Sequence, residues 1–403
     1  MKITFWDDNG GPARTPVWEH IIAEFEEANS NIDVEYVGIP IAQVQQKYDT
    51  AIAGRALPDV GGVSTAMLAN LVPQQALEPL DDRVGGSALN GKLNEQVLKA
   101  VRNTVPDGKL YMVPMSTNMG VFWYRKDLFA EAGLQPPQTW DEFFADIDKL
   151  TDTGKNRYGF TIRGGAGSIA QMLEVIYGQS GITEIFDSSG KATINDPRNV
   201  AALERLTALY KKNTPEADLT NDYAKMVAQY GGGNIAIMQH NLGSYNDQVK
   251  AFGKEKIAAM AVPKAATGAR TVTTHPVSGI GVFATGSKKD AAFKFAEFAA
   301  GKAMNSYWGE KTGQLPANTE VSGEAWLSSA QHIGEATKVL NDPSTKVVQL
   351  PYYLPEFNAI TKTDTEPLFQ KVLLGEMSEK DFLDQFAAKF TEAQAKYKQR
   401  NGG

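Results

Sequence analysis

The chain has 403 residues, of which 40 are basic and 47 acidic, so its net charge is −7. That length exceeds one ordinary hydrophobic core and fits two sizeable domains. The mildly acidic balance disfavours nucleic acid and anionic membranes as partners, and the absence of cysteine excludes thiol catalysis, disulfides and thiolate metal sites.

The N-terminal segment predicts a strand, a helix and a second strand in succession. Residues 2–6 form an apolar run, residues 15–29 carry apolar side chains at helical spacing, and residues 32–36 alternate. Such a unit is right-handed and pairs its strands in parallel. Ligands bind beyond the carboxyl ends of parallel strands. We therefore expect the binding end of this sheet to include the residues that follow the first strand, Asp7, Asp8 and Asn9.

The first strand begins directly at the N-terminus, without an apolar leader. No apolar run approaches the roughly 20 residues of a membrane span. We expect either a cytosolic protein or an extracytoplasmic protein whose signal segment is absent from this chain.

Helical and strand patterns alternate along the rest of the sequence, which predicts the α/β class. Thr139 and Glu142 form a capping box at the start of a helix. Phe382, Phe386 and Phe390 are spaced as one face of a C-terminal helix. Further elements are expected at residues 42–53 (helix), 59–63 (strand, followed by Ser64 and Thr65), 158–163 (strand) and 169–177 (helix).

Eight segments, read in chain order, resemble the family of extracellular solute-binding proteins that serve ABC-type sugar importers. The most specific stretch is WYRKDLFAEAGL at residues 123–134, which continues into PPQTWDEF at 136–143. One departure is Arg125, where the family usually has asparagine. The other segments are residues 25–34, 51–60, 77–81, 107–114, 234–238, 278–299 and 314–316.

This resemblance implies a two-lobed, periplasmic-binding-protein-like fold of type II, with discontinuous lobes joined by hinge segments. The N-terminal lobe would comprise residues 1–112 and 265–315, and the C-terminal lobe residues 116–262 and 320–403. A ligand cleft between the lobes would close by hinge motion.

The same resemblance implies a monomeric receptor that captures a mono- or oligosaccharide, without cofactor or catalysis, and delivers it to the membrane permease of an ABC importer. It would be a cell-surface lipoprotein or a periplasmic protein.

Polar residues just past strand ends are the expected ligand contacts, because carboxylates make strong hydrogen bonds to hydroxyls and aromatic rings stack on sugar faces. A solvated loop remains the alternative for Asp7, Asp8 and His240, and a structural plug for the tyrosines. The expected residues are Asp7, Asp8, Asn9, Ser64 and Thr65 in the first lobe, Asn118, Gln239, His240, Tyr352 and Tyr353 in the second, and Ser278 at the return crossing.

A glycine-rich segment at residues 163–170 contains G-x-G-x-x-A between an expected strand and helix, and Glu184 follows at about the spacing of a dinucleotide site. We favour a ligand-facing loop at a helix N-terminus, whose backbone N–H groups can meet a polar ligand. A second match, beginning at Gly279, is interpreted as a strand.

Two other classes of function stay open besides the sugar receptor. The same fold can bind a polyamine, an anion or iron, for which Tyr352 and Tyr353 would be the ligands. A cytosolic enzyme, glycoside-cleaving or nucleotide-dependent, is the third class. Asp7 and Asp8 make a poor catalytic pair, because adjacent residues at a strand end point to different sides. The four histidines are scattered and form no H-E-x-x-H motif, so no metal site is expected.

Overall fold

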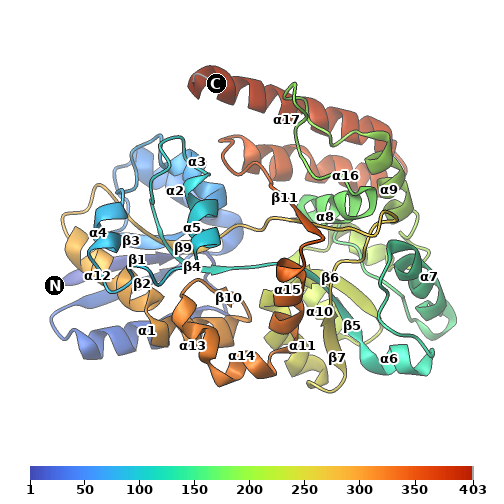
Figure 1. Cartoon of the computed structure of the whole chain (residues 1–403), viewed down its shortest axis with the longest axis horizontal. Helices are drawn as coiled ribbons and strands as arrows, with labels where there is room; N and C mark the ends of the chain where they lie inside the picture. The colour runs from blue at the N-terminus through green and yellow to red at the C-terminus, as the bar shows by residue number, and fades with distance from the viewer. Residues whose placement is uncertain (402–403) are drawn as a thin grey trace. The chain divides into compact units, whose positions relative to one another are not determined.

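The computed structural model describes residues 1–401, apart from the side chain of Ala42. The chain divides into two compact units, each assembled from two separate stretches of sequence (Figure 1). Unit 1 comprises Met1–Asn118 and Pro276–Ser329, and unit 2 comprises Met119–His275 and the chain from Ala330 onward. Residues 265–275, expected in the N-terminal lobe, lie in unit 2 because their strand pairs with one near residue 345.

Unit 1 is built on one mixed six-stranded sheet with the order β10-β4-β9-β3-β1-β2. β1 pairs in parallel with β2 and β3, whereas β9 is antiparallel to both β3 and β4. The parallel β1–β2 pair confirms the strand–helix–strand unit predicted at the N-terminus. The strands are β1 Lys2–Asp7, β2 Asp33–Gly38, β3 Val60–Ser64, β4 Val113–Thr117, β9 Ser278–Val282 and β10 Leu315–Pro316.

Helices pack on both faces of this sheet and form two apolar cores. In one, the Phe5 ring lies 4.7 Å from Trp18 and 5.1 Å from Phe295, measured between ring centroids. In the other, Tyr48 stacks on Phe283. With both faces covered, polar function is confined to the strand ends. The helices are α1 Thr15–Ala28, α2 Val44–Ala53, α3 Thr65–Leu71, α4 Asp81–Gly85, α5 Glu95–Arg102, α12 Lys289–Ala300, α13 Lys302–Thr312 and α14 Ala325–Ser329.

Unit 2 contains an antiparallel sheet of order β6-β5-β7 and a separate parallel pair, β11-β8. Its strands are β5 Gly120–Arg125, β6 Ile237–Asn241, β7 Ile257–Met260, β8 Arg270–Thr273 and β11 Thr345–Val348. Its helices are α6 Lys126–Glu131, α7 Trp140–Leu150, α8 Ser168–Ser180, α9 Pro197–Thr207, α10 Tyr223–Gly231, α11 Tyr245–Phe252, α15 Gln331–Asn341, α16 Glu366–Leu373 and α17 Glu379–Asn401.

The expected C-terminal helix is α17, and its three phenylalanines are fully buried, which confirms the predicted apolar face. The expected strand over residues 158–163 does not form. Tyr158 makes one isolated bridge, and then the N–H of Ile162 donates to the Asp218 carboxylate and that of Gly164 to the Asp218 carbonyl. Residues 158–159 bond to the segment that leads into β6, but at residues 160, 162 and 164 the backbone N–H groups bond to residues 213 and 218 instead of a neighbouring strand.

The predicted capping box is confirmed at the start of α7. The N–H of Glu142 donates to Thr139 Oγ1 at 3.2 Å, and the Glu142 carboxylate accepts from the N–H of Thr139 at 3.1 Å. Two backbone groups that would otherwise lack partners are thereby bonded.

Replacing Thr139 with alanine removes one of these acceptors. We expect Thr139→Ala to destabilise unit 2 by about 1 kcal/mol, measured by urea denaturation. Thr139→Ser keeps the hydroxyl and serves as the control, expected to unfold close to the wild-type midpoint. Equal midpoints for the alanine variant and the wild type would show that the cap contributes nothing.

Candidate functional site

Strand register brings the expected polar residues of unit 1 to one edge of its sheet. β1 and β3 are parallel, so Asp7 and Ser64 both lie at carboxyl ends. β9 runs antiparallel to β3 and pairs Ser278 with Ser64, which puts the start of β9 at the same edge. The end of β4 pairs Ser116 with Ser278. Asn118 follows one residue past β4 and belongs to unit 1, not to the second lobe where we expected it.

Asp7 and Asp8 differ in burial and in hydrogen bonding. Asp7 is fully buried, and its carboxylate accepts from the Tyr36 hydroxyl at 2.8 Å and from the N–H of Asn9 at 3.1 Å. Asp8 is half-buried, and no other side chain among the described residues donates a hydrogen bond to its carboxylate. Burial raises the pKa of Asp8 to about 6, although the Arg14 charge opposes that shift. Asp8 thus has acceptor positions that no other side chain among the described residues fills.

Gly62 in β3 provides the room that Asp8 occupies. A Cβ atom on Gly62 would lie 2.6 Å from Asp8 Oδ1, too close for any real contact. Of the neighbouring hydroxyls, Thr65 Oγ1 accepts from the N–H of Val277 at 3.1 Å and is already used, while Ser64 and Ser278 remain half-buried. Asp8, Ser64 and Ser278 therefore form the accessible polar edge of unit 1.

The corresponding edge of unit 2 carries a buried carboxylate that we did not anticipate. Glu174 of α8 is 3% exposed, and its Oε2 accepts from Gln239 Nε2 at 3.0 Å. Its Oε1 is buried without a hydrogen-bond partner, and His275 Nε2 lies 3.9 Å from it. A side chain on Gly120, the first residue of β5, would collide with this carboxylate. Buried polar atoms without partners are rare and require a functional or structural reason.

His240 follows Gln239 on β6 and is equally unsatisfied. The residue is 2% exposed, and neither ring nitrogen has a hydrogen-bond partner. Burial, followed by the nearby Arg163 charge, lowers the pKa of His240 to about 3, so the ring is neutral at physiological pH. Tyr223, which is 37% exposed, packs edge-on against His240 at 4.4 Å between ring centroids.

Arg163 completes the cluster in unit 2. Its Nε donates to the Ala166 carbonyl at 2.6 Å, and its guanidinium lies 6.0 Å from the Tyr223 ring centroid. It makes no ion pair within 4 Å in the part of the chain that the structure describes. Burial lowers its pKa. An arginine placed this way has donors left for a polar ligand.

The two expected tyrosines are bonded within unit 2 and do not act as a pair. Tyr352 is buried, and its hydroxyl donates to the Thr274 carbonyl at 2.7 Å. The Tyr353 hydroxyl donates to Gln394 Oε1 at 2.7 Å on α17, and burial raises the pKa of Tyr353 to about 12. This geometry resembles the structural plug more than a pair of iron ligands.

The glycine-rich loop serves packing rather than ligand capture. The N–H groups of Gly164, Gly165 and Gly167 donate to the Asp218 carbonyl, the Asn221 carbonyl and the Glu366 carboxylate. A Cβ on Gly164 or Gly165 would lie 2.6 to 2.9 Å from the carbonyl oxygens of the 218–221 loop. The expected free donors are therefore absent at these three positions.

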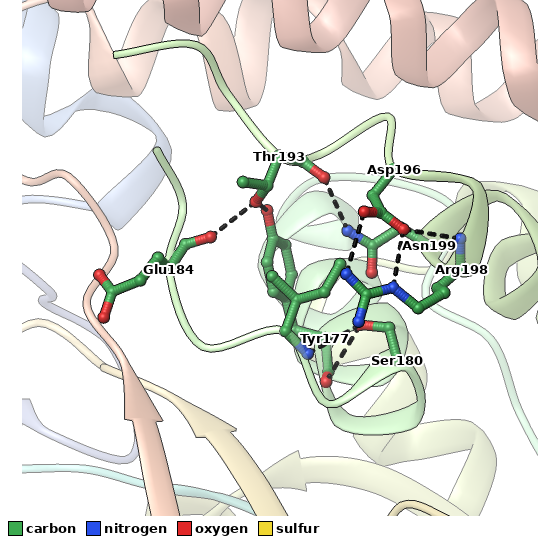
Figure 2. A network of polar contacts seen from close by, with 8 residues as sticks. Tyr177, Ser180, Glu184, Thr193, Asp196, Arg198 and Asn199 are labelled. Atoms are coloured by element: carbon green, nitrogen blue, oxygen red, sulfur yellow. Dashed lines mark hydrogen bonds and ion pairs between the residues drawn. The ribbon is translucent and has the colours of Figure 1, made fainter. Parts of the chain in front are cut away.

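Glu184 does not stand where a dinucleotide site needs an acidic residue. It lies in the loop after α8, where its carbonyl accepts from Thr193 Oγ1 at 2.6 Å, and its exposed carboxylate points away from the network (Figure 2). The Thr193 hydroxyl also bonds to the Tyr177 hydroxyl, and the Thr193 carbonyl accepts from Asn199 Nδ2. These contacts hold the loop between α8 and α9. The second G-x-G match is strand β9, as interpreted.

Within residues 1–401 no group of three or more histidine and acidic side chains could hold a metal ion. No helix in the same range is long and apolar enough to cross a membrane.

Comparison with known proteins identifies the family. The model of the family described as bacterial extracellular solute-binding protein matches residues 11–306. The chain belongs to this family. The mannitol-binding protein of Pseudomonas aeruginosa is 26% identical over an alignment of 416 residues, which covers 94% of this chain and 89% of the relative.

Solved structures of this solute-binding family share the fold, which confirms the predicted class. Maltose-bound MalE3 of T. maritima superposes with a TM-score of 0.84 at 23% identity, covering 96% of this chain and 98% of that one. A solute-binding protein of Agrobacterium vitis with bound D-mannitol superposes with a TM-score of 0.79 at 24% identity, covering 98% and 99% of the two chains.

Four residues of the unit 2 cluster escaped the sequence analysis of this solute-binding protein: Arg163, Glu174, Tyr223 and His275. Glu174 sits within an apolar helical run, and a charged residue in such a run is the signal that marks it. Arg163 precedes the glycine-rich loop that we examined for its N–H groups. Nothing in the local sequence distinguishes Tyr223 or His275.

The Gly120–Glu174 contact predicts a specific sensitivity of unit 2. Gly120→Ala must displace the Glu174 carboxylate and break its bond to Gln239, which we expect to destabilise unit 2 by about 1–3 kcal/mol. Differential scanning calorimetry measures the loss. The matched control is Gly231→Ala, whose added Cβ would meet its nearest atom, Ala251 Cβ, at an ordinary 3.5 Å. A Gly120→Ala protein that melts like the control would contradict the proposed packing.

Proposed function

We propose that this chain is the extracytoplasmic substrate-binding protein of an ABC-type carbohydrate importer. In this proposal it captures a mono- or oligosaccharide, or a related polyol, and delivers it to the membrane permease without chemical change. It acts as a monomer, without cofactor or nucleic acid, from the periplasm or from a lipid anchor on the cell surface. Family membership and the mannitol-binding relative support the solute class.

The observation that carries this proposal is a set of polar side chains with unused hydrogen-bonding positions at the strand-end edges of both units. In unit 1 the carboxylate of Asp8 takes no hydrogen bond from another side chain. In unit 2 the buried Glu174 Oε1 and both His240 nitrogens lack partners. Acceptors that lose water without gaining a partner destabilise a protein, so a hydroxyl-rich ligand that donates to them is favoured.

Mixed charge in the unit 2 cluster favours a neutral ligand over the alternatives. Arg163 offers donors and Glu174 offers an acceptor, while His240 is neutral because burial and the Arg163 charge depress its pKa. An anion would have to approach Glu174, and a polyamine would have to approach Arg163. A calorimetric screen of sugars, polyols, spermidine, phosphate and ferric citrate separates these classes. Saturable binding of a polyamine, anion or iron without any sugar would overturn the carbohydrate assignment.

Asp8 makes affinity dependent on pH. A ligand hydroxyl bonds best to the ionised carboxylate, and the Asp8 pKa is about 6, so affinity is full above pH 7 and declines as pH falls through 6. With this pKa, about nine-tenths of Asp8 is protonated at pH 5, which weakens binding about tenfold, or about 1.4 kcal/mol. Isothermal titration calorimetry from pH 5 to 8 measures this change.

Three variants test that assignment. Asp8→Asn should bind the sugar weakly at every pH, because the titrating group is gone. Asp8→Ala and His240→Ala should each lose more than tenfold in affinity while their far-ultraviolet circular dichroism stays unchanged. A wild-type affinity that is flat from pH 5 to 8, together with unchanged binding in both alanine variants, would remove Asp8 and His240 from the site.

We further propose that ligand favours a closed arrangement of the two units by binding it more tightly than an open one. The radius of gyration measured by solution X-ray scattering should then fall when a bound sugar is added at saturation. The sugar should be recovered intact after prolonged incubation. A cleaved or oxidised sugar would refute the receptor assignment, and a scattering curve indifferent to a tightly bound sugar would refute closure.

A further inference from the structure

A hollow in unit 2 lies at the opposite end of β5 from the proposed sugar-binding cluster. β5 begins at Gly120, beside Glu174, and ends at Arg125, which lines this hollow. Its volume is about 460 Å³, within the range of small-molecule sites. Three consecutive glycines at the end of α10, residues 231–233, form part of its wall and leave the space open.

The polar side chains that line this hollow are all hydrogen-bond donors with positive or neutral charge. They are Arg125, Lys155, Asn156, Arg157 and Asn234, and no acidic residue is among them. A surface of this composition suits a negatively charged ligand.

The carboxylates that hold these cations stand outside the lining. Arg125 donates to Asp127 through Nε at 2.8 Å and Nη2 at 2.6 Å. Arg157 donates through Nη1 to both oxygens of Glu131, at 3.0 and 3.1 Å. The acids therefore fix the guanidinium groups without filling the hollow.

One side of the Arg157 guanidinium is unused. Its Nε is buried and has no hydrogen-bond partner, and Nη2 donates to no described residue. The Nε–Nη2 edge of arginine presents two parallel donors that match two oxygens of one oxyanion. Such an unpaired donor is the kind of buried polar group that a ligand satisfies.

The negative end of α10 does not oppose an anion here. Arg125 Nη1 donates to the Gly233 carbonyl at 3.2 Å, just past the last turn of that helix. A cation at a helix C-terminus offsets the dipole. Arg125 thus compensates the helix end. Lys155 and Arg157, each ion-paired with one carboxylate outside the lining, remain to donate hydrogen bonds to a ligand.

We propose that this hollow binds a small free oxyanion of the phosphate or sulfate type, with Lys155, Asn156 and Arg157 as its donors. The proposal is independent of the sugar-binding function, since it concerns a separate set of residues. It predicts a protein that holds a neutral solute at one end of β5 and an anion at the other.

Isothermal titration calorimetry of the full chain with inorganic phosphate, and then with sulfate, tests this proposal against sodium chloride of equal ionic strength. We expect saturable binding of phosphate or sulfate to the wild type and none of chloride. Asn156→Asp adds a carboxylate to the lining and should weaken anion binding at least tenfold. Asn156 has a φ of 52°, a conformation that aspartate also tolerates, so the fold should persist.

Lys155 offers a second variant with a matched control. Lys155 and Lys149 are both exposed and both pair with an aspartate three residues earlier. Lys155→Gln should weaken anion binding at least threefold, and Lys149→Gln, which lies outside the hollow, should leave it unchanged. Sugar affinity should be unaltered in all three variants.

Three outcomes would overturn the oxyanion site. The wild type could show no saturable anion binding, or Asn156→Asp and Lys155→Gln could bind like the wild type. Parallel losses of sugar and anion affinity would show that the two sites are not separate.

Discussion

Burial of the sheet on both faces is the constraint on which the rest of unit 1 depends. β1 and β3 are covered by helices on either side, so their interior side chains are apolar or absent, as with Phe5 and Gly61. Water and ligand reach these strands at their ends. The polar groups of β1, β3, β4 and β9 gather at one edge. The strand register aligns the ends of β1, β3 and β4 with the start of β9 there, and the two sheet faces are covered by helices.

This constraint explains why the sequence predicts the site of unit 1 better than that of unit 2. Asp8, Ser64 and Ser278 follow or begin short apolar strands, so their location at a sheet edge can be read from local pattern alone. Asn118 also lies at this edge. Its assignment to the other lobe was wrong, because the boundary between the units falls one residue later, after Asn118. Asp7 is also at the edge, but its side chain turns inward and accepts a hydrogen bond from Tyr36. Because Tyr36 lies 29 residues away on β2, the local sequence does not reveal this orientation.

In unit 2 the deciding contacts join residues far apart in sequence. Glu174 meets Gln239 and His275, which lie on different elements, and no local pattern encodes that meeting. Arg163 lies on a segment whose strand pattern fails, because the 216–221 loop supplies its backbone partners instead. The predictions of α7 and α17 are confirmed for the opposite reason, because a capping box and a row of phenylalanines are local signals.

In both units a glycine in a strand leaves space for a carboxylate from another segment. Gly62 in β3 leaves room for the Asp8 carboxylate, and Gly120 in β5 leaves room for that of Glu174. In each case the strand has a residue without a side chain, so that a carboxylate from another segment can lie against the strand backbone. The result is an acceptor held at low exposure next to rigid strand structure, with little freedom to lose when a ligand donates to it. Gly164 and Gly165 work differently, since their N–H groups bond within the protein and their missing side chains admit the neighbouring 218–221 loop. At the two candidate edges glycine makes space for an ionisable side chain, whereas in the 164–165 segment it makes space for backbone.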